Sequence, residues 1–376
     1  MRYYIIAGEA SGDLHASNLM RELKKLDPDA KFRCWGGDKM QSEGAELVRH
    51  YRDLAFMGFT EVLMNLRAIL RNIQFCKQDI LEWKPDVLIL VDYPGFNLRI
   101  AAFAKQHKIR IHYYISPQVW AWKQSRVEKI KRDVDRMFVI LPFEKDFYQK
   151  FGMKVDFVGH PLLDALSQVQ ANLPAKDAWL KQHELDQRPV IALLPGSRKQ
   201  EISIMLPLML SITEQFPEYQ FVIAGAPSLP REFYDQLLRG SSVKMIPGET
   251  YTILSFAHAA LVTSGTATLE TALFRVPEVV CYKGGKLSYY IARSLVKVPY
   301  ISLVNLVMNR EVVKELIQQE LNSANLAREL HFILDKDKRM IMQKDYAGLE
   351  QKLGGQGASA KTAAEMWNDI RGLKES

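Results

Sequence analysis

The sequence predicts an α/β protein with two domains, each built on a parallel β-sheet covered by helices on both faces. Three observations lead to this fold class. Short apolar runs typical of buried strands alternate with amphipathic helical patterns along most of the chain. A polar stretch near the middle interrupts this alternation, and the pattern then starts again. A chain of 376 residues that is 48% hydrophobic and 25% charged is long enough for two such domains.

The first domain is predicted to span residues 1–168. Its strand-like runs lie at Tyr3–Ala7, Lys31–Trp35, Val87–Val91, Arg110–Ile115, Met137–Leu141 and Val155–Val158. The first run leads through Gly8–Asp13 into a helix, but Glu9 and Ser11 occupy the turn, so it is not a dinucleotide-binding GxGxxG turn. Because a carboxylate here would repel a pyrophosphate, we expect Glu9 and Ser11 to contact sugar hydroxyls or an acceptor.

The segment Thr60–Phe75 carries an apolar stripe at helical spacing. Members of the stripe are Phe59, Val62, Leu63, Leu66, Ile69, Leu70 and Ile73. A helix that packs on the core is the simplest interpretation. The alternative is a face that enters the headgroup layer of a membrane, with Arg67, Arg71 and Lys77 meeting anionic lipid. The candidate membrane-contact residues are Val62, Leu63, Leu66, Ile69 and Leu70.

Asp92 directly follows the buried run Val87–Val91 and begins the segment Asp92–Asn97, which leads into another helix. Parallel sheets bind ligands and present catalytic groups at the carboxyl ends of their strands. An aspartate in a turn can instead bond its own backbone or cap a helix. We favour a catalytic role for Asp92. The next strand ends in a similar turn, where two tryptophans near Gln118 either line a pocket or pack the domain.

Residues 169–189 are polar and are predicted to link the two domains. The second domain, predicted at 190–340, opens with Val190–Leu194 and a glycine turn that contains Gly196, Ser197 and Arg198. The guanidinium of Arg198 can bind a phosphate through two parallel hydrogen bonds. Further strands are predicted at Gln220–Ala224, Val243–Ile246, Ala259–Val262 and Glu278–Tyr282. A final helix at about 357–372 could return to the first domain.

The stretch Val262–Glu270 is the other candidate anion site in this half. Ser264, Gly265 and Thr266 form a small-residue turn between a strand and a helix that contains Thr268. The first N–H groups of such a helix are unpaired and, with the helix dipole, favour a diphosphate. Glu270 lies about one turn further on, where a carboxylate could bind a ribose hydroxyl. The alternative is a helix capped by Ser and Thr. The anion site is favoured because Arg198 also follows a strand.

Composition narrows the class of partner. A net charge of +7 and a pI near 9.1 suggest an anionic partner: nucleic acid, a phosphorylated ligand or a lipid surface. The charge is spread along the chain, which argues against nucleic acid. The three cysteines are scattered, so we expect neither a disulfide frame nor a zinc site, and no metal site or cofactor is predicted. No secretory leader or spanning segment is recognised, so we expect a cytoplasmic protein or one that binds a membrane from that side.

Several long motifs, all in one order, resemble the lipid-A-disaccharide synthase family of glycosyltransferases. They are GEASGD (Gly8–Asp13), DYPGFN (Asp92–Asn97), SPQVWAWK (Ser116–Lys123), LPFEKDFY (Leu141–Tyr148), GHPL (Gly159–Leu162), LLPGSRKQEI (Leu193–Ile202), SGTATLE (Ser264–Glu270) and the run Val298–Glu311. The resemblance covers nearly the whole chain. Two positions depart from the family pattern: Gly95 stands where the family has a second Asp, and Val304 stands where it has Pro.

The resemblance implies a GT-B architecture, in which two Rossmann-like parallel-sheet domains face a cleft. It implies transfer of 2,3-diacylglucosamine from UDP-2,3-diacylglucosamine to the 6-hydroxyl of 2,3-diacylglucosamine 1-phosphate, on the cytoplasmic face of an inner membrane with an anionic surface. Asp92 would be the general base. Gly196, Ser197, Arg198, Ser264, Gly265, Thr266, Thr268 and Glu270 would bind UDP. Glu9, Ser11, Gln118, Asn305 and Arg310 would contact the sugar or phosphate. A homodimer is left open.

Two other functions fit parts of the sequence. A UDP-N-acetylglucosamine 2-epimerase or a MurG-like transferase would share the architecture, but a soluble-sugar epimerase has no use for an apolar membrane face. A non-catalytic membrane protein that binds nucleotide sugars would keep Arg198 and the Ser264 turn, yet it would not need Asp92 at a strand end.

Overall fold

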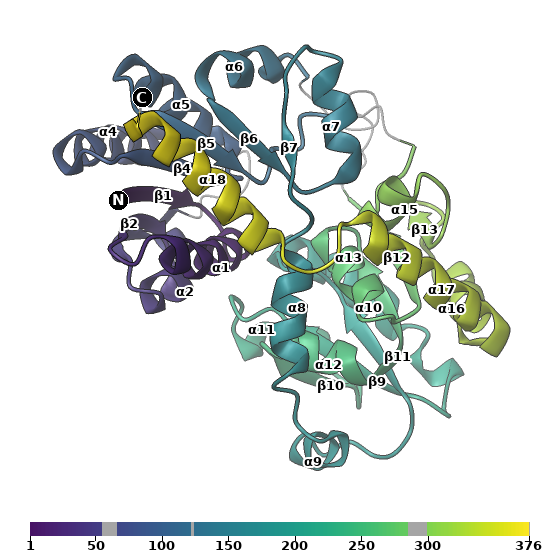
Figure 1. Cartoon of the computed structure of the whole chain (residues 1–376). Coiled ribbons are helices and arrows are strands. Elements are labelled where there is room, and N and C mark those ends of the chain that lie inside the picture. The colour runs from purple at the N-terminus through teal and green to yellow at the C-terminus, as the bar shows by residue number, and fades with distance from the viewer. Residues whose placement is uncertain (55–65, 122–123, 285–298, 376) are drawn as a thin grey trace. The chain divides into compact units, whose positions relative to one another are not determined.

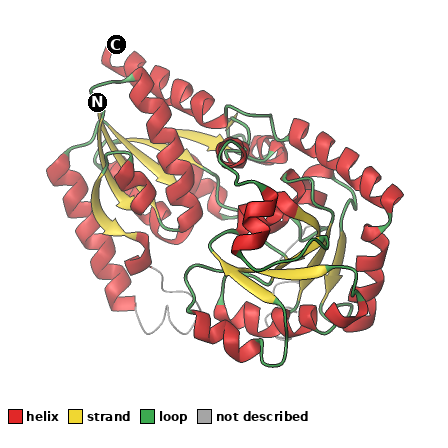
Figure 2. Ribbon diagram, turned by 90° about the horizontal axis from the view of Figure 1, so that it is seen from below, coloured by secondary structure: helices red, strands yellow, loops and turns green. Residues whose placement is uncertain are grey.

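The computed structural model describes residues 1–54, 66–121, 124–284 and 299–375. The described chain forms two compact units (Figure 1). The first contains Met1–Ala165 and Leu353–Ser376, and the second contains Leu166–Lys352. In each unit a parallel sheet is enclosed by helices, as Figure 2 shows with strands in yellow and helices in red. The predicted α/β class, with two Rossmann-like parallel-sheet domains, is confirmed.

The sheet of the first unit has the strand order β3-β2-β1-β4-β5-β6-β7 over the described residues. Its strands are β1 (Arg2–Ala7), β2 (Lys31–Gly36), β3 (Glu46–His50), β4 (Val87–Val91), β5 (Arg110–Tyr114), β6 (Arg136–Val139) and β7 (Asp156–Phe157). All neighbouring pairs are parallel. The central strands are fully buried because helices cover both faces, which explains their continuous apolar runs.

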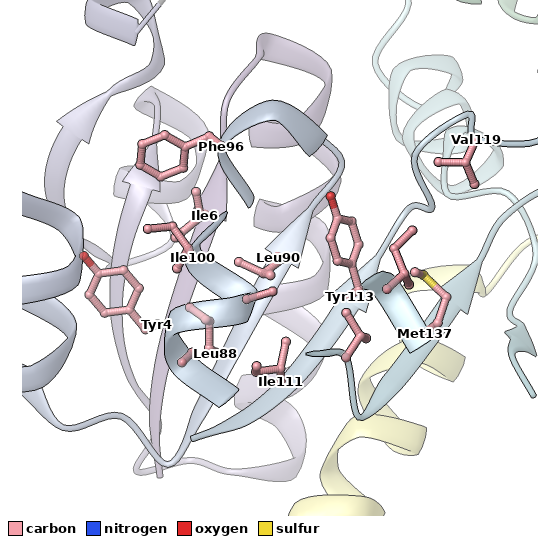
Figure 3. Close-up of a cluster of buried hydrophobic side chains, with 14 of the residues drawn as sticks. Tyr4, Ile6, Leu88, Leu90, Phe96, Ile100, Ile111, Tyr113, Val119 and Met137 are labelled. Atoms are coloured by element: carbon pink, nitrogen blue, oxygen red, sulfur yellow. The ribbon is translucent and has the colours of Figure 1, made fainter. Parts of the chain in front are cut away.

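Alternate residues of these strands point to opposite faces of the sheet and belong to two separate hydrophobic cores. One core contains Tyr4, Leu90 and Tyr113 (Figure 3). The helices that contribute to it are α4 (Leu66–Trp83), α5 (Pro94–Gln106), α6 (Arg126–Asp133) and α7 (Pro142–Gln149). The other core contains Ile5 and Ile89 and is covered by α1 (Ala10–Leu26) and α18 (Ala358–Glu375). The short helices α2 (Asp38–Ser42) and η1 (Tyr51–Leu54) flank β3.

The final helix α18 packs against α1 of the first unit, with Met366 and Ile370 in the shared core. The carboxylate of Asp369 accepts hydrogen bonds from Arg110 Nη2 at 2.7 Å and is 2.8 Å from His112 Nε2, both on β5. Asp164 accepts from the backbone N–H groups of Gly357 and Ser359, at the start of the helix. These contacts fasten the end of the chain to the first sheet.

The second sheet repeats the same topology, with the order β10-β9-β8-β11-β12-β13 and parallel pairing throughout the described strands. Its strands are β8 (Val190–Leu194), β9 (Gln220–Gly225), β10 (Lys244–Pro247), β11 (Ala257–Thr263), β12 (Glu278–Tyr282) and β13 (Lys314–Ile317). Its helices are α9 (Lys176–Gln182), α10 (Lys199–Leu210), η2 (Thr213–Gln215), α11 (Arg231–Leu237), α12 (Thr250–Phe256), α13 (Thr266–Leu273), α15 (Leu303–Met308), α16 (Ser323–Leu334) and α17 (Lys336–Lys352).

The polar stretch 169–189, which we expected to be a linker, is partly structured. It begins within α8 (Leu162–Gln170) and contains α9. Trp179 and Leu180 of α9 are almost fully buried in the core of the second unit. Composition missed this packing because only two large apolar residues of α9 face the core. Among the described helices, none is both long and apolar enough to span a bilayer.

Candidate active site at the strand ends

The strand order of each sheet defines where its ligand should bind. In the first sheet the order reverses between β1 and β4, and in the second it reverses between β8 and β11. Open parallel sheets bind ligands at the carboxyl ends of the strands beside such a reversal. The turns after these four strands contain Glu9, Asp92, Arg198 and Ser264, respectively. The candidate residues of each unit therefore lie at the edge of their own sheet that topology favours.

Asp92 is held in an unusual backbone conformation. Its φ angle is +44° and that of Tyr93 is +49°, so two consecutive residues other than glycine are left-handed. The carbonyl oxygen of Asp92 accepts hydrogen bonds from Tyr113 Oη at 2.5 Å and from Asn97 Nδ2 at 2.8 Å. Its N–H donates to the carbonyl of Tyr114 at 3.1 Å. The backbone polar groups of Asp92 thus all have hydrogen-bond partners. Its carboxyl does not cap α5, because Tyr93 is the N-cap residue of that helix.

The carboxyl of Asp92 is half-buried, and burial is the main cause that raises its pKa to about 7. The nearby carboxylate of Glu9 raises it further, and a hydrogen bond from the backbone of Tyr93 acts in the opposite direction. A carboxyl with a pKa near neutrality can take up a proton at physiological pH, which an ordinary surface aspartate cannot. The geometry therefore fits a general base.

Glu9 and Ser11 are exposed at the start of α1, where Glu9 is the N-cap and makes no side-chain capping bond. The preceding residue must be glycine because the Tyr93 ring covers it: a Cβ on Gly8 would lie 2.3 Å from Tyr93 Cγ. The β1 turn and the Asp92 turn are therefore packed directly on one another. Polar groups of both turns are available at the same sheet edge.

Gln118 is exposed on a loop after β5 that is anchored by its neighbours. Ser116 Oγ is 2.7 Å from Tyr148 Oη, and the Val119 side chain is buried. Below this loop the buried carboxyl of Glu144 accepts from the N–H of Leu141 at 2.9 Å, and burial raises its pKa to about 7. Gln118 therefore lies on an anchored loop, and its side chain is exposed to solvent.

In the second unit, Gly196 to Arg198 form the turn between β8 and α10. Gly196 has φ +116°, and a Cβ there would meet the Glu201 carboxylate at 2.9 Å, so glycine is required. Ser197 and Arg198 are exposed. Among the described residues, the Arg198 guanidinium has one polar contact, a long one of 3.5 Å with Glu201, and its side chain is 61% exposed. Its charge is therefore accessible to an anion from solvent.

The turn after β11 presents Ser264, Gly265 and Thr266 at the start of α13. Gly265 is the N-cap and no side chain caps the helix, so the first N–H groups have no side-chain acceptor among the described residues. Ser264 Oγ lies 3.3 Å from the carbonyl of Ile301. Thr268 is fully buried, and its hydroxyl donates to the Gly265 carbonyl at 2.8 Å. Thr268 therefore supports the turn and does not present its hydroxyl to a ligand.

Glu270 is half-buried in α13, and burial raises its pKa. One of its oxygens accepts from Tyr251 Oη at 2.9 Å, and this hydrogen bond favours the charged form. The tyrosine orients the carboxyl, and the second oxygen of Glu270 has no hydrogen-bond partner among the described residues. No pattern in the sequence links Tyr251 to Glu270, since the two lie on different helices.

Asn305 does not have the role that we expected. It is fully buried in α15, and its amide group donates to the Val313 carbonyl and to Glu315. Its oxygen accepts from the N–H groups of Val312 and Val313. All of its hydrogen-bonding capacity is used within the unit, so we assign it no sugar contact. Arg310 is exposed and pairs with Asp345 at 2.6 Å.

The two departures from the family pattern are well accommodated. Gly95 is exposed in the first turn of α5, and nothing lies within 4 Å of a Cβ built there. Val304 is the second residue of α15, a position in the first turn where a helix accepts valine as well as proline.

The predicted membrane face lies partly outside the described residues. Val62 and Leu63 lie outside the described residues, as do the side-chain surroundings of Leu66, with which α4 begins. Ile69 is partly buried and packs on the core of the first unit, which favours the core-facing interpretation at this position. Leu70 is 52% exposed. The core-facing interpretation therefore holds for Ile69, and an outward role remains for Leu70.

Sequence reasoning gave no role to two residues that define the Asp92 turn, Tyr113 and Asn97. Asn97 is part of the Asp92–Asn97 motif, so its position offered a signal. Tyr113 is one apolar-looking member of a buried strand and offered none. Among the described residues, no group of His, Cys, Asp or Glu side chains could hold a metal ion.

Comparison with known proteins gives one consistent family. A family model described as lipid-A-disaccharide synthetase matches residues 3–366. A lipid-A-disaccharide synthase from Syntrophus aciditrophicus is 43% identical over 368 residues, which cover 96% of this chain and 95% of that protein. The enzyme of the same name from Nitrosococcus oceani is 40% identical and covers 96% of this chain and 94% of its own.

Solved structures show the same fold at much lower identity. The UDP-GlcNAc 2-epimerase from Neisseria meningitidis bound to UDP-GlcNAc has a TM-score of 0.70 at 16% identity and covers 98% of this chain and 100% of that chain. A UDP-GlcNAc 2-epimerase from Methanocaldococcus jannaschii in complex with UDP-GlcNAc and UDP has a TM-score of 0.66 at 14% identity and covers 98% of this chain and 99% of its own. These likenesses establish the GT-B fold. The sequence relatives establish more: the chain belongs to the lipid-A-disaccharide synthase family of glycosyltransferases.

Proposed function

We propose that this protein transfers 2,3-diacylglucosamine from UDP-2,3-diacylglucosamine to the 6-hydroxyl of 2,3-diacylglucosamine 1-phosphate, giving a β-1,6-linked disaccharide 1-phosphate and UDP. The family supports the reaction class: a nucleotide-sugar donor and a lipid acceptor. The specific substrates are the ones that the motif resemblance implies. The observation that carries the proposal is the half-buried Asp92 carboxyl, whose pKa is raised to about 7 at the end of a central strand.

In this reaction Asp92 is the general base. The acceptor 6-hydroxyl attacks the anomeric carbon of the donor on the face opposite UDP, through an oxocarbenium-like transition state. A carbon–oxygen bond forms to the acceptor as the bond to the UDP oxygen breaks, and the hydroxyl proton passes to Asp92. A positioned base typically contributes a factor of about 10²–10⁴ to the rate.

The second unit holds the donor. The departing diphosphate gains negative charge, which the Arg198 guanidinium and the N–H groups at the start of α13 can stabilise. Gly196 and Ser197 allow close approach of the backbone, and Gly265 and Thr266 form the α13 turn. The free oxygen of Glu270 would bind a ribose hydroxyl. The solved epimerases that bind UDP-GlcNAc support a nucleotide-sugar site in this fold.

The first unit holds the acceptor. Glu9, Ser11 and Gln118 are exposed at the same sheet edge as Asp92 and supply acceptors and donors for sugar hydroxyls. Arg310 of the second unit is a further candidate for a phosphate contact, since its ion pair with Asp345 is exposed and can exchange for a ligand.

We also propose that the enzyme works at the anionic surface of the inner membrane, on its cytoplasmic face. Both proposed substrates carry acyl chains, and the net charge of +7 favours such a surface. On α4, Leu70, Phe75 and Leu81 are exposed apolar side chains, and Arg67 and Arg71 lie beside them in the sequence with exposed side chains. Leu70 and Leu81 are about three helical turns apart and therefore lie on one side of α4, which suits contact with headgroups and acyl chains.

The test is a product assay with purified protein, both lipid substrates and mass detection of the disaccharide. Asp92→Asn should retain UDP affinity, because Arg198 and the α13 turn lie in the other unit, and should lose turnover by a factor of about 10²–10⁴. The matched control is Asp133→Asn, which removes another buried carboxylate of the first unit, one paired with Arg132. Near-normal turnover of Asp92→Asn would remove Asp92 as the base. Conversion of UDP-GlcNAc to its 2-epimer, without disaccharide, would support an epimerase instead.

A further inference from the structure

The peptide that joins Asp92 to Tyr93 is the strained part of the candidate site. Both residues have φ angles in the left-handed region, +44° and +49°, and neither is glycine. Residues with a Cβ avoid this region, and two in a row persist only where the surrounding structure fixes them. The direction of the Asp92 carboxyl depends on this conformation, because its Cα belongs to the strained pair.

Two buried side chains fix the orientation of that peptide. Its carbonyl oxygen, on Asp92, accepts from Tyr113 Oη at 2.5 Å and from Asn97 Nδ2 at 2.8 Å. Rotation of the peptide to relieve the strain would break both hydrogen bonds and leave buried polar groups unsatisfied. Tyr113 and Asn97 are both fully buried, so water cannot replace either donor.

Tyr113 is built into the sheet and cannot follow a moving turn. It lies opposite Leu90 in the register of β4 and β5, and its ring belongs to the apolar core drawn in Figure 3. Burial keeps the pKa of Tyr113 well above its ordinary value, with Asp92 and Tyr148 of α7 adding to the effect and Arg126 of α6 opposing it. The phenol is therefore protonated at any working pH and remains a donor.

We propose that Tyr113 is a positioning residue for the reaction: by donating to the Asp92 carbonyl, its phenol keeps residues 92 and 93 left-handed and so keeps the Asp92 carboxyl half-buried beside Glu9. The inference rests on the proposed role of Asp92 as general base. Tyr113 itself is fully buried and touches no substrate.

The test is Tyr113→Phe, which removes one oxygen and keeps the ring. With one of its two donors gone, the peptide can relax and the Asp92 carboxyl gains water. Its pKa should then fall from about 7 toward the ordinary value of 3.8. Among the described residues, the groups that act on the pKa of this carboxyl are Glu9, the N-cap of α1, and the Tyr93 backbone, and both remain in the variant. We expect kcat to fall on the order of tenfold with the donor KM unchanged, since a tenfold change is the scale of one well-placed hydrogen bond. The acid limb of the pH profile should move to lower pH by about one unit.

Tyr3→Phe is the matched control. Tyr3 is also fully buried in the first sheet, and its hydroxyl donates to Asp27 at 3.1 Å, but its ring lies in the core on the opposite face. Its loss should lower thermal stability by an amount similar to that of Tyr113→Phe while kcat and the acid limb stay at wild-type values. A purely structural role for Tyr113 would make the two variants alike.

The readouts separate failure of this inference from failure of the proposed reaction. If wild type makes no disaccharide, the proposed reaction is wrong, and the inference is then decided by the pKa of the Asp92 carboxyl, measured by carbon-13 NMR in wild type and in Tyr113→Phe. A lower pKa in the variant supports the positioning role. If wild type is active, a Tyr113→Phe variant with wild-type kcat, acid limb and Asp92 pKa overturns it.

Discussion

Asp92→Asn should make the folded protein more stable at neutral and alkaline pH, although it removes the proposed base. The pKa of the Asp92 carboxyl is raised from 3.8 to about 7 in the fold, chiefly by burial and then by Glu9. An amide of nearly the same shape carries no charge, so it avoids the cost of placing a carboxylate in this half-buried position. A catalytic group that is held at the expense of stability is a common feature of active sites.

The magnitude follows from linkage between protonation and folding. Because the folded-state pKa is above the unfolded value, the folded protein binds more protons between pH 3.8 and about 7, and stability falls as pH rises through this window. The shift from 3.8 to about 7 corresponds to an upper limit of about 4 kcal/mol. Solvent reaches part of the carboxyl, so we expect ~1–3 kcal/mol in practice. The difference between variant and wild type should open above pH 4 and level off above pH 7.

The assay is urea unfolding of wild type and Asp92→Asn at pH 4, 6 and 8.5, with midpoints compared at each pH. Asp146→Asn is the control, since Asp146 is an exposed aspartate of α7 in the same unit and its replacement should change stability by less than ~0.5 kcal/mol at every pH. The comparison uses differences between variants because a chain of two units need not unfold in a single step.

A constant difference between Asp92→Asn and wild type across this pH range would refute the reasoning. Such a result would mean that the carboxyl titrates alike in the folded and unfolded chain. Burial would then not prepare Asp92 to accept a proton near neutral pH, whatever the variant did to turnover.

Four further predictions address other parts of the molecule. Arg198→Ala should weaken UDP binding about 10–100-fold by calorimetry, because charged hydrogen bonds to phosphate are lost. Lys199→Ala, at the first residue of α10, should have a smaller effect. Leu70→Ala should reduce binding to anionic vesicles severalfold with little change in stability, since Leu70 is 52% exposed. Ile73→Ala should lower the free energy of unfolding by about 2–4 kcal/mol, since Ile73 is 6% exposed. For Asp369, burial acts to raise its pKa, but hydrogen bonds from a histidine and an arginine of β5 outweigh burial and lower it. Asp369→Asn should therefore destabilise the protein at pH 7 in a thermal melt, and the difference from wild type should shrink as pH falls below about 4.

Three of the four predictions have a direct contrary result. Wild-type affinity of Arg198→Ala would place the diphosphate elsewhere. Vesicle binding that survives Leu70→Ala would shift the membrane contact away from α4. A destabilisation by Asp369→Asn that did not change with pH would show that the carboxylate acts through packing and not through its charge.

The fold was predictable because the succession of buried strand, turn and helix repeats along the chain. Buried parallel strands such as Val87–Val91 need apolar residues at every position, and each is followed by a turn and a helix, so both sheets are visible in the sequence. The helix within 169–189 was not foreseen, for the opposite reason. α9 is a short surface helix that buries only Trp179 and Leu180, and two residues do not make a period.

The position of the candidate site was predictable from the sequence. Which side chains face a ligand and which bond to the protein itself was not. Asp92, Arg198 and Ser264 follow strands, and topology alone puts them at the ligand-binding edge of their sheets. Asn305 is just as polar, yet the oxygen of its amide group accepts hydrogen bonds from the backbone N–H groups of Val312 and Val313. A sequence motif reports that a polar group is needed, but only the structure reports whether a ligand or the protein itself satisfies it.

The repeated topology explains why each unit contributes two turns to its candidate site. In each sheet, chain connections leave the two central strands toward opposite faces, so the turns after them diverge and expose the strand ends between them. The first unit supplies carboxylates there, Glu9 and Asp92, whose mutual repulsion favours proton uptake. The second supplies a guanidinium and a helix start, Arg198 and the Ser264 turn, which favour an anion. One topology is thus adapted to opposite charges by the residues of four turns, and this division matches a reaction in which one substrate loses a proton and the other releases a diphosphate.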